Sequence, residues 1–372
     1  MAVFTIVIVF LFGLSSLGNS AEPKLAWRLE WERTLEAARK EGQVTVYIDH
    51  SAGALIDSGV FQKAYPAIKL QGVPNRNSEV RIMAERRAGK YIPDVNIAGV
   101  TQNYPELYDA KVLDPIKPAL ILPEVVDESR WYQGRHRYTD LEGKFVFIFL
   151  GLPQTGSLTY NTNLLNPKEI KSFWDLVQPK WRGKIVARDM RGPGPGRGGI
   201  RFFYHNPELG SEFIRRFFGT TDITLFRDSR LGTDWLATGK FAICYACEGV
   251  DKAITQGLPM GRIGILKEGA ALVANYGTIA LINKAPHPNA AKVFINWFLS
   301  REGQLTLQKA LAKSEDSGPD SLRIDIPKDD VGPDNRRLDG VKYLEMFTPD
   351  RMDMRPPLKV FEAAIAEAQK KQ

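Results

Sequence analysis

This sequence of 372 residues has few of the side chains that build metal centres and catalytic sites. It contains two cysteines and four histidines, and the histidines are scattered at His50, His136, His205 and His287. Zinc sites take their ligands at short, regular spacings, so this distribution excludes a recognisable zinc motif. The hydrolase motifs Gly-x-Ser-x-Gly and His-Glu-x-x-His are also missing. The sequence therefore predicts no enzyme, no cofactor and no metal site.

The only two cysteines, Cys244 and Cys247, stand in the stretch Phe-Ala-Ile-Cys-Tyr-Ala-Cys-Glu-Gly. A Cys-x-x-Cys pair has redox activity when it opens a helix, because the helix N-terminus stabilises a thiolate. Here the preceding residues have the pattern of a strand, in which positions i and i+3 face opposite ways. A disulfide would need a turn between the two residues. Inert structural cysteines, a disulfide, and a catalytic or metal-binding pair all stay open.

Long hydrophobic runs are also missing beyond residues 3–14. That run has the length of a signal-peptide core and is short for a membrane span. Small residues from Gly18 to Ala21 suit cleavage near position 20 or 21, although no basic residue precedes the run. We expect residues 1–21 to be a cleaved signal peptide, with a retained membrane anchor as the alternative.

The length and the charge of the chain suggest its size class and its partners. A chain this long exceeds what one hydrophobic core usually serves, so two lobes are expected. Lysine and arginine number 50 against 43 aspartates and glutamates, which gives a formal net charge of +7. A positive surplus favours anionic partners, and a solvated basic surface without a specific role is the alternative. No nucleic-acid recognition motif or dense basic stripe is present, so nucleic acid is not an expected partner.

Helical and strand-like patterns alternate along the chain. In the first part we expect helices over residues 27–42, 54–65 and 79–88 and strands over residues 43–48, 68–73 and 94–98. In the second part we expect strands over residues 145–150, 158–161, 184–187, 223–226 and 241–245 and helices over residues 209–218 and 231–238. Two late amphipathic helices, after Pro288 and over the last fifteen residues, fit core packing better than partner binding. Such alternation predicts an α/β fold with mostly parallel sheets covered by helices.

Ligands of such sheets bind beyond the carboxyl ends of the strands. The loops expected at these ends contain His50 and Ser51, Asn77 and Ser78, and Thr101. We therefore expect these side chains to meet at one crevice.

The segment from Arg188 to Arg201 combines arginine with glycine and proline. It follows an expected strand and precedes an expected helix. Glycine lets backbone N–H groups approach a ligand, a helix N-terminus favours negative charge, and arginine binds carboxylate or phosphate through two hydrogen bonds. The segment matches neither the P-loop nor the dinucleotide-binding motif. We expect an anion site at Arg188, Arg191, Gly196 and Arg197, with a flexible surface loop as the alternative.

Polar residues before two expected helices have two interpretations. Asn77-Ser78 and Asp228-Ser229-Arg230 are typical of N-caps, which satisfy free backbone N–H groups, and the same groups can meet a ligand. Tyr245, at the end of an expected strand, and Tyr276 are further candidates. The expected ligand-binding residues are His50, Ser51, Asn77, Ser78, Thr101, Arg188, Arg191, Gly196, Arg197, Ser229, Arg230, Tyr245 and Tyr276.

Several short motifs share their order and spacing with one group of transport proteins. They are Val-Thr-Val-Tyr at 44–47, Ala-Glu-Arg-Arg-Ala-Gly-Lys-Tyr at 84–91, Tyr-Asn-Thr-Asn-Leu at 160–164, Phe-Trp-Asp-Leu at 173–176, Pro-Lys-Trp-Arg-Gly-Lys-Ile at 179–185, Ala-Pro-His-Pro-Asn-Ala-Ala at 285–291 and Ser-Arg-Glu-Gly-Gln at 300–304. The chain resembles the periplasmic solute-binding proteins of bacterial ABC transporters with the type 2 fold (extracellular solute-binding family 1). The likeness extends from about residue 27 to residue 350 and is strongest to the branch of ferric-iron-binding proteins.

This resemblance implies two α/β lobes, each with a mixed, mostly parallel sheet flanked by helices, and a ligand cleft that closes by a hinge. It also implies discontinuous lobes, with residues 25–118 and 273–326 in lobe 1 and residues 119–272 and 327–372 in lobe 2. The implied location is the periplasm, and the implied partners are a small solute and an ABC permease at the inner membrane. Such proteins are usually monomers.

The chain departs from its iron-binding relatives at one place. They carry adjacent tyrosines where this sequence has Glu248-Gly249-Val250-Asp251. Ferric iron is a hard cation that prefers anionic oxygen ligands. If iron were the ligand, Tyr245, Tyr276, His50 and Glu248 would have to hold it. We therefore expect a small anionic organic or phosphorylated solute rather than bare iron. The alternatives are a ferric-iron or iron-complex binding protein, a thiol-dependent periplasmic enzyme, and an interaction protein that uses its basic surface.

Overall fold

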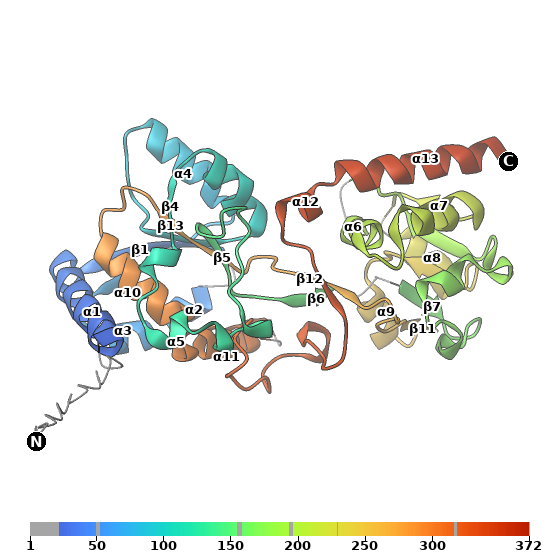
Figure 1. The fold of residues 1–372 in the computed structure, drawn as a ribbon. Helices are drawn as coiled ribbons and strands as arrows, with labels where there is room; N and C mark the ends of the chain where they lie inside the picture. The colour runs from blue at the N-terminus through green and yellow to red at the C-terminus, as the bar shows by residue number, and fades with distance from the viewer. Residues whose placement is uncertain are drawn as a thin grey trace, which may run out of the picture.

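The structure is a computed structural model that describes residues 22–49, 53–154, 158–192, 196–228, 230–315 and 318–371. The expected signal peptide, residues 1–21, lies outside the described residues. Figure 1 shows two lobes, with helix α1 (Glu22–Glu41) on the first and helix α13 (Arg355–Lys371) on the second. Within the described part of the chain, no helix combines the length and the apolar character that a membrane span requires.

The first lobe is built on a six-stranded mixed sheet. Its strands are β1 (Gln43–Ile48), β2 (Lys69–Pro74), β3 (Val95–Ala98), β4 (Leu113–Asp114), β5 (Val146–Ile148) and β13 (Thr278–Ile282). Strand β1 pairs in parallel with β2 and β3, and β13 pairs antiparallel with β3, β4 and β5. Val44 and Val46 face one hydrophobic cluster and Tyr47 faces another, because successive side chains of a strand point to opposite faces. Both faces of the sheet are therefore covered.

Helices cover both faces of this sheet. They are α1, α2 (Gly53–Asp57), α3 (Val60–Ala64), α4 (Ser78–Arg87), η2 (Gln102–Leu107), η3 (Lys117–Ala119), α5 (Pro123–Val126), η4 (Glu128–Arg130), η5 (Tyr132–Gly134), α10 (Pro288–Leu299) and α11 (Arg301–Glu315). Helix α10 is buried, and the rings of Phe294 and Trp297 both contact Phe61 of α3. The single helix expected over residues 54–65 is wrong: Ser58 and Gly59 divide it into α2 and α3.

The second lobe has a five-stranded mixed sheet in the order β11-β7-β10-β8-β9. Its strands are β7 (Leu158–Asn161), β8 (Ile185–Arg188), β9 (Thr224–Phe226), β10 (Ile243–Tyr245) and β11 (Met260–Arg262). Its helices are η6 (Pro167–Glu169), η7 (Phe173–Val177), η8 (Pro179–Trp181), α6 (Arg197–His205), α7 (Gly210–Thr220), α8 (Leu231–Ala237), α9 (Val250–Thr255), α12 (Pro349–Met352) and α13. Phe218 of α7 meets Phe361 of α13 edge to face at 4.8 Å, so the C-terminal helix belongs to this core.

A small third sheet joins the lobes, as Figure 1 shows. It has the order β14-β12-β6 and contains β6 (Leu152–Gln154), β12 (Ala270–Val273) and β14 (Tyr343–Glu345), preceded by the short helix η9 (Pro333–Asn335). The chain crosses to the second lobe through β6, returns through β12, and crosses a third time after β14. Glu345 of β14 accepts a hydrogen bond from Arg137 Nε at 2.7 Å, which ties the third crossing to the first lobe. These crossing strands are the candidate hinge.

The lobe boundary differs from the one expected at residues 118 and 119. Strand β5 pairs with β13, and Trp131 and Phe147 lie in the hydrophobic core of the first lobe. Residues 119–150 therefore pack with lobe 1 rather than with lobe 2. The proline-rich stretch over residues 114–118 connects β4 to η3 inside the first lobe, where Ile116 is fully buried.

Candidate functional site

A cavity of about 310 Å³ lies where both lobes and the crossing strands meet. Its lining residues come from the loop after β3, from α6, from β6, from β12 and the loop after it, and from the segment around α12: Gly99, Val100, Thr101, Gln154, Gly198, Arg201, Val273, Ala274, Asn275, Met346, Phe347 and Met352. The loop after β3 therefore lines this cavity, at the kind of strand end where ligands of such sheets bind. The volume is at the lower end of the range for small-molecule sites, about 300–1,000 Å³.

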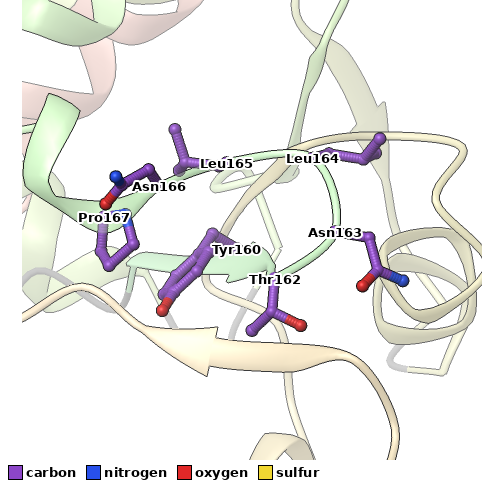
Figure 2. A pocket seen from close by; sticks show the side chains of 7 residues that line it. All are labelled: Tyr160, Thr162, Asn163, Leu164, Leu165, Asn166 and Pro167. Carbon is purple, nitrogen blue, oxygen red and sulfur yellow. The ribbon is translucent and has the colours of Figure 1, made fainter.

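Other surface hollows are larger, but each of them is lined by residues of a single lobe. One of them has a volume of about 460 Å³ and is lined by Tyr160 and residues 162–167. Figure 2 shows these side chains. All of these residues belong to β7 and the segment after it. Movement of one lobe against the other would not enclose a ligand there. The smaller cavity between the lobes is therefore the better candidate site.

Helix α6 carries two arginines without a carboxylate partner among the described residues, and one of them, Arg201, lines this cavity. Arg197 and Arg201 are four residues apart, so they lie on one side of the helix. Arg201 lines the cavity, and its Nη1 donates to the Met352 carbonyl at 3.4 Å. The Nε atoms of both arginines are buried without a hydrogen-bond partner. Burial lowers the pKa of Arg201, and the positive charge of Arg197 lowers it further.

Close packing around the glycines of the Gly196-Arg197-Gly198-Gly199 stretch positions α6. Gly196 begins the helix with φ of +93°, and a Cβ there would lie 2.6 Å from the Met190 sulfur. A Cβ at Gly199 would overlap the Tyr245 hydroxyl. At Gly198 it would lie 2.5 Å from Gln154 Oε1, across the junction with hinge strand β6. The glycines therefore let the first turn of α6 sit against the sheet and the hinge, and this placement brings Gly198 and Arg201 to the cavity.

The other two arginines expected to bind ligand are already paired inside the second lobe. Arg188 Nη1 lies 2.5 Å from Glu248 Oε1. The Arg191 guanidinium donates hydrogen bonds to Asp189 at 2.8 and 2.7 Å, the Arg191 backbone N–H donates another at 3.1 Å, and Arg227 Nε donates to Asp189 at 3.0 Å. The hydrogen bond from Arg191 lowers the pKa of Asp189 to about 2. Neither Arg188 nor Arg191 lines the cavity, because each neutralises a carboxylate next to it.

Tyr245 and Tyr276 lie in different cores. Tyr245 is fully buried, packs against Phe203 and donates a hydrogen bond to the Gly196 carbonyl at 3.2 Å. Burial raises the pKa of Tyr245, which disfavours a phenolate. Tyr276 packs against the hydrophobic core of the first lobe. Tyr245 therefore packs against α6, and it does not belong to the described lining of the cavity.

The residues that would have to hold iron do not come together in the described part of the chain. Glu248 pairs with Arg188, Tyr245 and Tyr276 pack into different lobes, and His50 lies outside the described residues. A search of the described part of the chain finds no group of three or more histidine, cysteine, aspartate or glutamate side chains that could hold a metal ion.

Of the residues expected at the strand ends of the first lobe, only some lie at the cavity. Thr101 lines the cavity. Ser78 begins α4, is fully buried and has an Oγ atom without a partner, whereas Asn77 is exposed and forms no side-chain cap. Gln102 joins the ends of β2 and β3, because its Nε2 donates to the Arg76 carbonyl and its Oε1 accepts from Gly99 N. The loops therefore share one edge, although only the β3 loop lines the cavity.

The remaining expected residues do not line the cavity or cannot be placed. Arg230 is exposed, and its backbone N–H donates to Asp228 Oδ1 at 2.8 Å, which is an ordinary turn before α8. His50, Ser51 and Ser229 lie outside the described residues.

Sequence reasoning missed several cavity residues. Arg201 carries a sequence signal, because it stands one helical turn after Arg197. Gln154, Asn275 and Met352 carry none, since they come from crossing segments whose meeting point depends on the tertiary structure.

The two cysteines form a disulfide. Strand β10 ends at Tyr245, and Ala246 has φ of 62°, so the chain turns and brings the Cα atoms of Cys244 and Cys247 to 5.9 Å. This is the turn that a disulfide required, and the option of inert free cysteines is wrong.

Comparison by sequence matches no protein-family model and no curated protein. Comparison of structures gives many matches. An ABC transporter protein from Clostridium perfringens has a TM-score of 0.58, with 15% identity over 88% of this chain and 99% of that one. The Trichodesmium protein IdiA (FutA), solved with iron and citrate, has a TM-score of 0.55 with 17% identity, covering 88% of this chain and 99% of that one. AfuA from Actinobacillus pleuropneumoniae, a periplasmic binding protein solved with fructose-6-phosphate, has a TM-score of 0.51 with 16% identity and the same coverage.

These matches cover both lobes and the crossing strands, at identities that bear on the fold alone. They confirm the architecture expected from the sequence motifs. The chain has the two-lobed α/β fold of ABC-transporter substrate-binding proteins.

Proposed function

We propose that the protein is the periplasmic substrate-binding component of an ABC importer and that it binds a small anionic organic or phosphorylated solute by hinge closure. The observation that carries this proposal is Arg201, a cavity-lining guanidinium with a buried, unpartnered Nε and no carboxylate partner among the described residues. Removing a charged group from water is costly unless hydrogen bonds replace the water. A bound anion supplies those hydrogen bonds.

The surroundings of Arg201 support this proposal. Arg197, one turn earlier, adds a second positive charge near the same site. Carboxylates and phosphates match the planar guanidinium through paired hydrogen bonds. The loop from Gly99 to Thr101 belongs to the first lobe and lines the same cavity as Arg201 of the second lobe. A ligand that contacts both sides would favour the closed arrangement over the open one.

The proposal includes how the protein works in transport. It binds solute as a monomer in the periplasm and delivers it to a permease at the inner membrane, without catalysing a reaction. The disulfide agrees with an oxidising compartment, and it leaves neither thiol free for a thiol-dependent enzyme.

The test begins with native mass spectrometry of freshly purified protein, to detect a retained solute. A thermal-shift panel of carboxylates, phosphates and sugar phosphates then follows. A ligand present at a hundred times its dissociation constant should stabilise the folded state by about 2.7 kcal/mol. Small-angle scattering should show a smaller radius of gyration with ligand, because the lobes close.

Two results would overturn the proposal. One is a panel in which no anion shifts the melting temperature. The other is iron that stays bound in stoichiometric amount through dialysis, since it would favour the iron-binding alternative.

A further inference from the structure

The inter-lobe cavity has one charged residue among its described lining residues, and that residue is Arg201. No aspartate or glutamate belongs to this described lining. A ligand ammonium group or a ferric ion would need anionic oxygen atoms close to it. The lining therefore suits a ligand whose charge is negative and confined to one end.

The uncharged polar groups of the lining come from three different elements. Thr101 follows β3, Gln154 ends β6, and Asn275 follows β12. The Asn275 carbonyl is used within the first lobe, because it accepts a hydrogen bond from Val100 N at 3.0 Å. The three side chains offer hydroxyl and amide groups, which bind uncharged donors and acceptors of a ligand.

The other lining side chains make an apolar wall next to Arg201. They are Val100, Val273, Ala274, Met346, Phe347 and Met352. Met346 and Phe347 are each 2% exposed, so the wall is continuous with the hydrophobic cores of the two lobes. Methionine side chains are flexible and polarisable, and they adapt to apolar ligands. An inorganic oxyanion would leave this wall and most of the cavity unused.

From this lining we infer that the ligand is an organic anion with one anionic head, bound at Arg201, and an uncharged, partly apolar body without an ammonium group. The inference rests on the proposed function and deepens it. The head is a carboxylate or a phosphate monoester, since both offer a guanidinium two acceptor oxygens. The body lies toward Met352 and the apolar wall, at the base of the cleft.

The test uses pairs of compounds that differ only in an amine. Hexanoate is compared with 6-aminohexanoate, and butyl phosphate with 4-aminobutyl phosphate, by isothermal titration calorimetry of the full chain. Inorganic phosphate is the fifth compound. We expect at least one amine-free compound to bind about tenfold or more tightly than its amine partner and than inorganic phosphate. Tighter binding of hexanoate or of butyl phosphate then identifies the head group.

The variant Met352→Gln provides the second measurement. We expect it to weaken binding of the better organic anion about fivefold and to leave the weak binding of inorganic phosphate unchanged, because only the organic ligand reaches the wall. A general loss of folding would weaken both, and it would appear as a lower melting temperature without ligand.

Failure of this inference is distinguishable from failure of the proposed function. If the amine-bearing compounds or inorganic phosphate bind as tightly as the amine-free compounds, the inferred ligand class is wrong while anion binding stands. The ligand class is also wrong if the broad panel finds its ligands only among zwitterions. If no anion binds at all, the proposed function fails together with the inference.

Discussion

Two pairs of arginines in one short segment have opposite surroundings. Arg188 and Arg191 hydrogen-bond to Glu248 and Asp189, inside the second lobe. Arg197 and Arg201, at most thirteen positions later, have buried Nε atoms without a partner. The first pair neutralises carboxylates next to it, and of the second pair Arg201 lines the cavity in which we propose that a ligand binds.

The difference teaches that arginine content alone does not identify an anion site. A guanidinium next to a carboxylate has its charge neutralised and its donors occupied. A guanidinium that is partly buried without such a partner lacks those hydrogen bonds, and a bound anion supplies them. Hydrogen bonds from arginine lower the pKa of Asp189 to about 2. For Arg201, burial lowers the pKa.

The largest effect is expected from Arg201→Gln. Losing a charged hydrogen-bond partner in a desolvated site costs about 2–3 kcal/mol, so anion affinity should fall by roughly a hundredfold. The control Arg191→Gln should keep affinity within about threefold, because Arg191 already pairs with Asp189. Calorimetric titration of both variants gives the comparison. Equal losses in the two variants would contradict the distinction between paired and unpaired arginines.

A smaller effect on binding is expected from Gly199→Ala. The added Cβ overlaps the Tyr245 hydroxyl, and overpacking of this kind costs about 1–3 kcal/mol of stability. Because α6 must shift, affinity should also fall by about tenfold. Gly192→Ala is the matched control, since a Cβ there meets nothing within 4 Å.

Adding Tyr245→Phe to the Gly199→Ala variant tests whether the overlap with the Tyr245 hydroxyl causes the loss of stability and affinity. It removes the overlapping hydroxyl, so it should restore part of the stability and part of the affinity in the Gly199→Ala background. The nearest ring atom, Cζ, remains 3.0 Å from the added Cβ, so the rescue should be incomplete. No rescue by Tyr245→Phe would mean that the contact with Tyr245 does not position α6.

Asp189→Asn should change stability and spare binding. Its pKa of about 2 lies below the ordinary value of 3.8, so the ion pairs add stability above about pH 4. That contribution should be about 2 kcal/mol at neutral pH and should disappear as the pH falls through about 2. Denaturant unfolding across pH measures the gap between wild type and variant. If the difference in free energy of unfolding stays constant down to pH 2, the charge of the Asp189 carboxylate is not the cause of that difference.

The smallest effect on binding is expected from removing the disulfide. In the double variant Cys244→Ser, Cys247→Ser, affinity should stay within about threefold, because neither cysteine lines the cavity. Stability should fall by about 2 kcal/mol or less, as the bond closes a very short loop. Titration and melting curves measure the two quantities. An affinity loss above about tenfold would indicate that the loop holding Glu248 helps to form the site.

Local pattern predicted most of the elements. The strand expected over residues 43–48 is β1, and the helices expected over residues 79–88 and 209–218 are α4 and α7 within one or two residues. The pattern did not reveal the break at Gly59 in the second expected helix, and it did not place β5 in the first lobe. Strand partners are set by contacts between distant residues, which periodicity does not encode.

From the sequence alone we predicted the two-lobed α/β class, the order of most strands and helices, and residues 188–201 as a candidate anion site. The packing of the strand ends showed that Arg201 lines the cavity and that Arg188 and Arg191 pair with Glu248 and Asp189 instead. Only the tertiary structure decided that Tyr245 packs against α6 and that Met352 comes to lie beside Arg201. The physical reason is that the chemistry of a charged side chain depends on its burial and its neighbours, and both are set by residues far away in the chain.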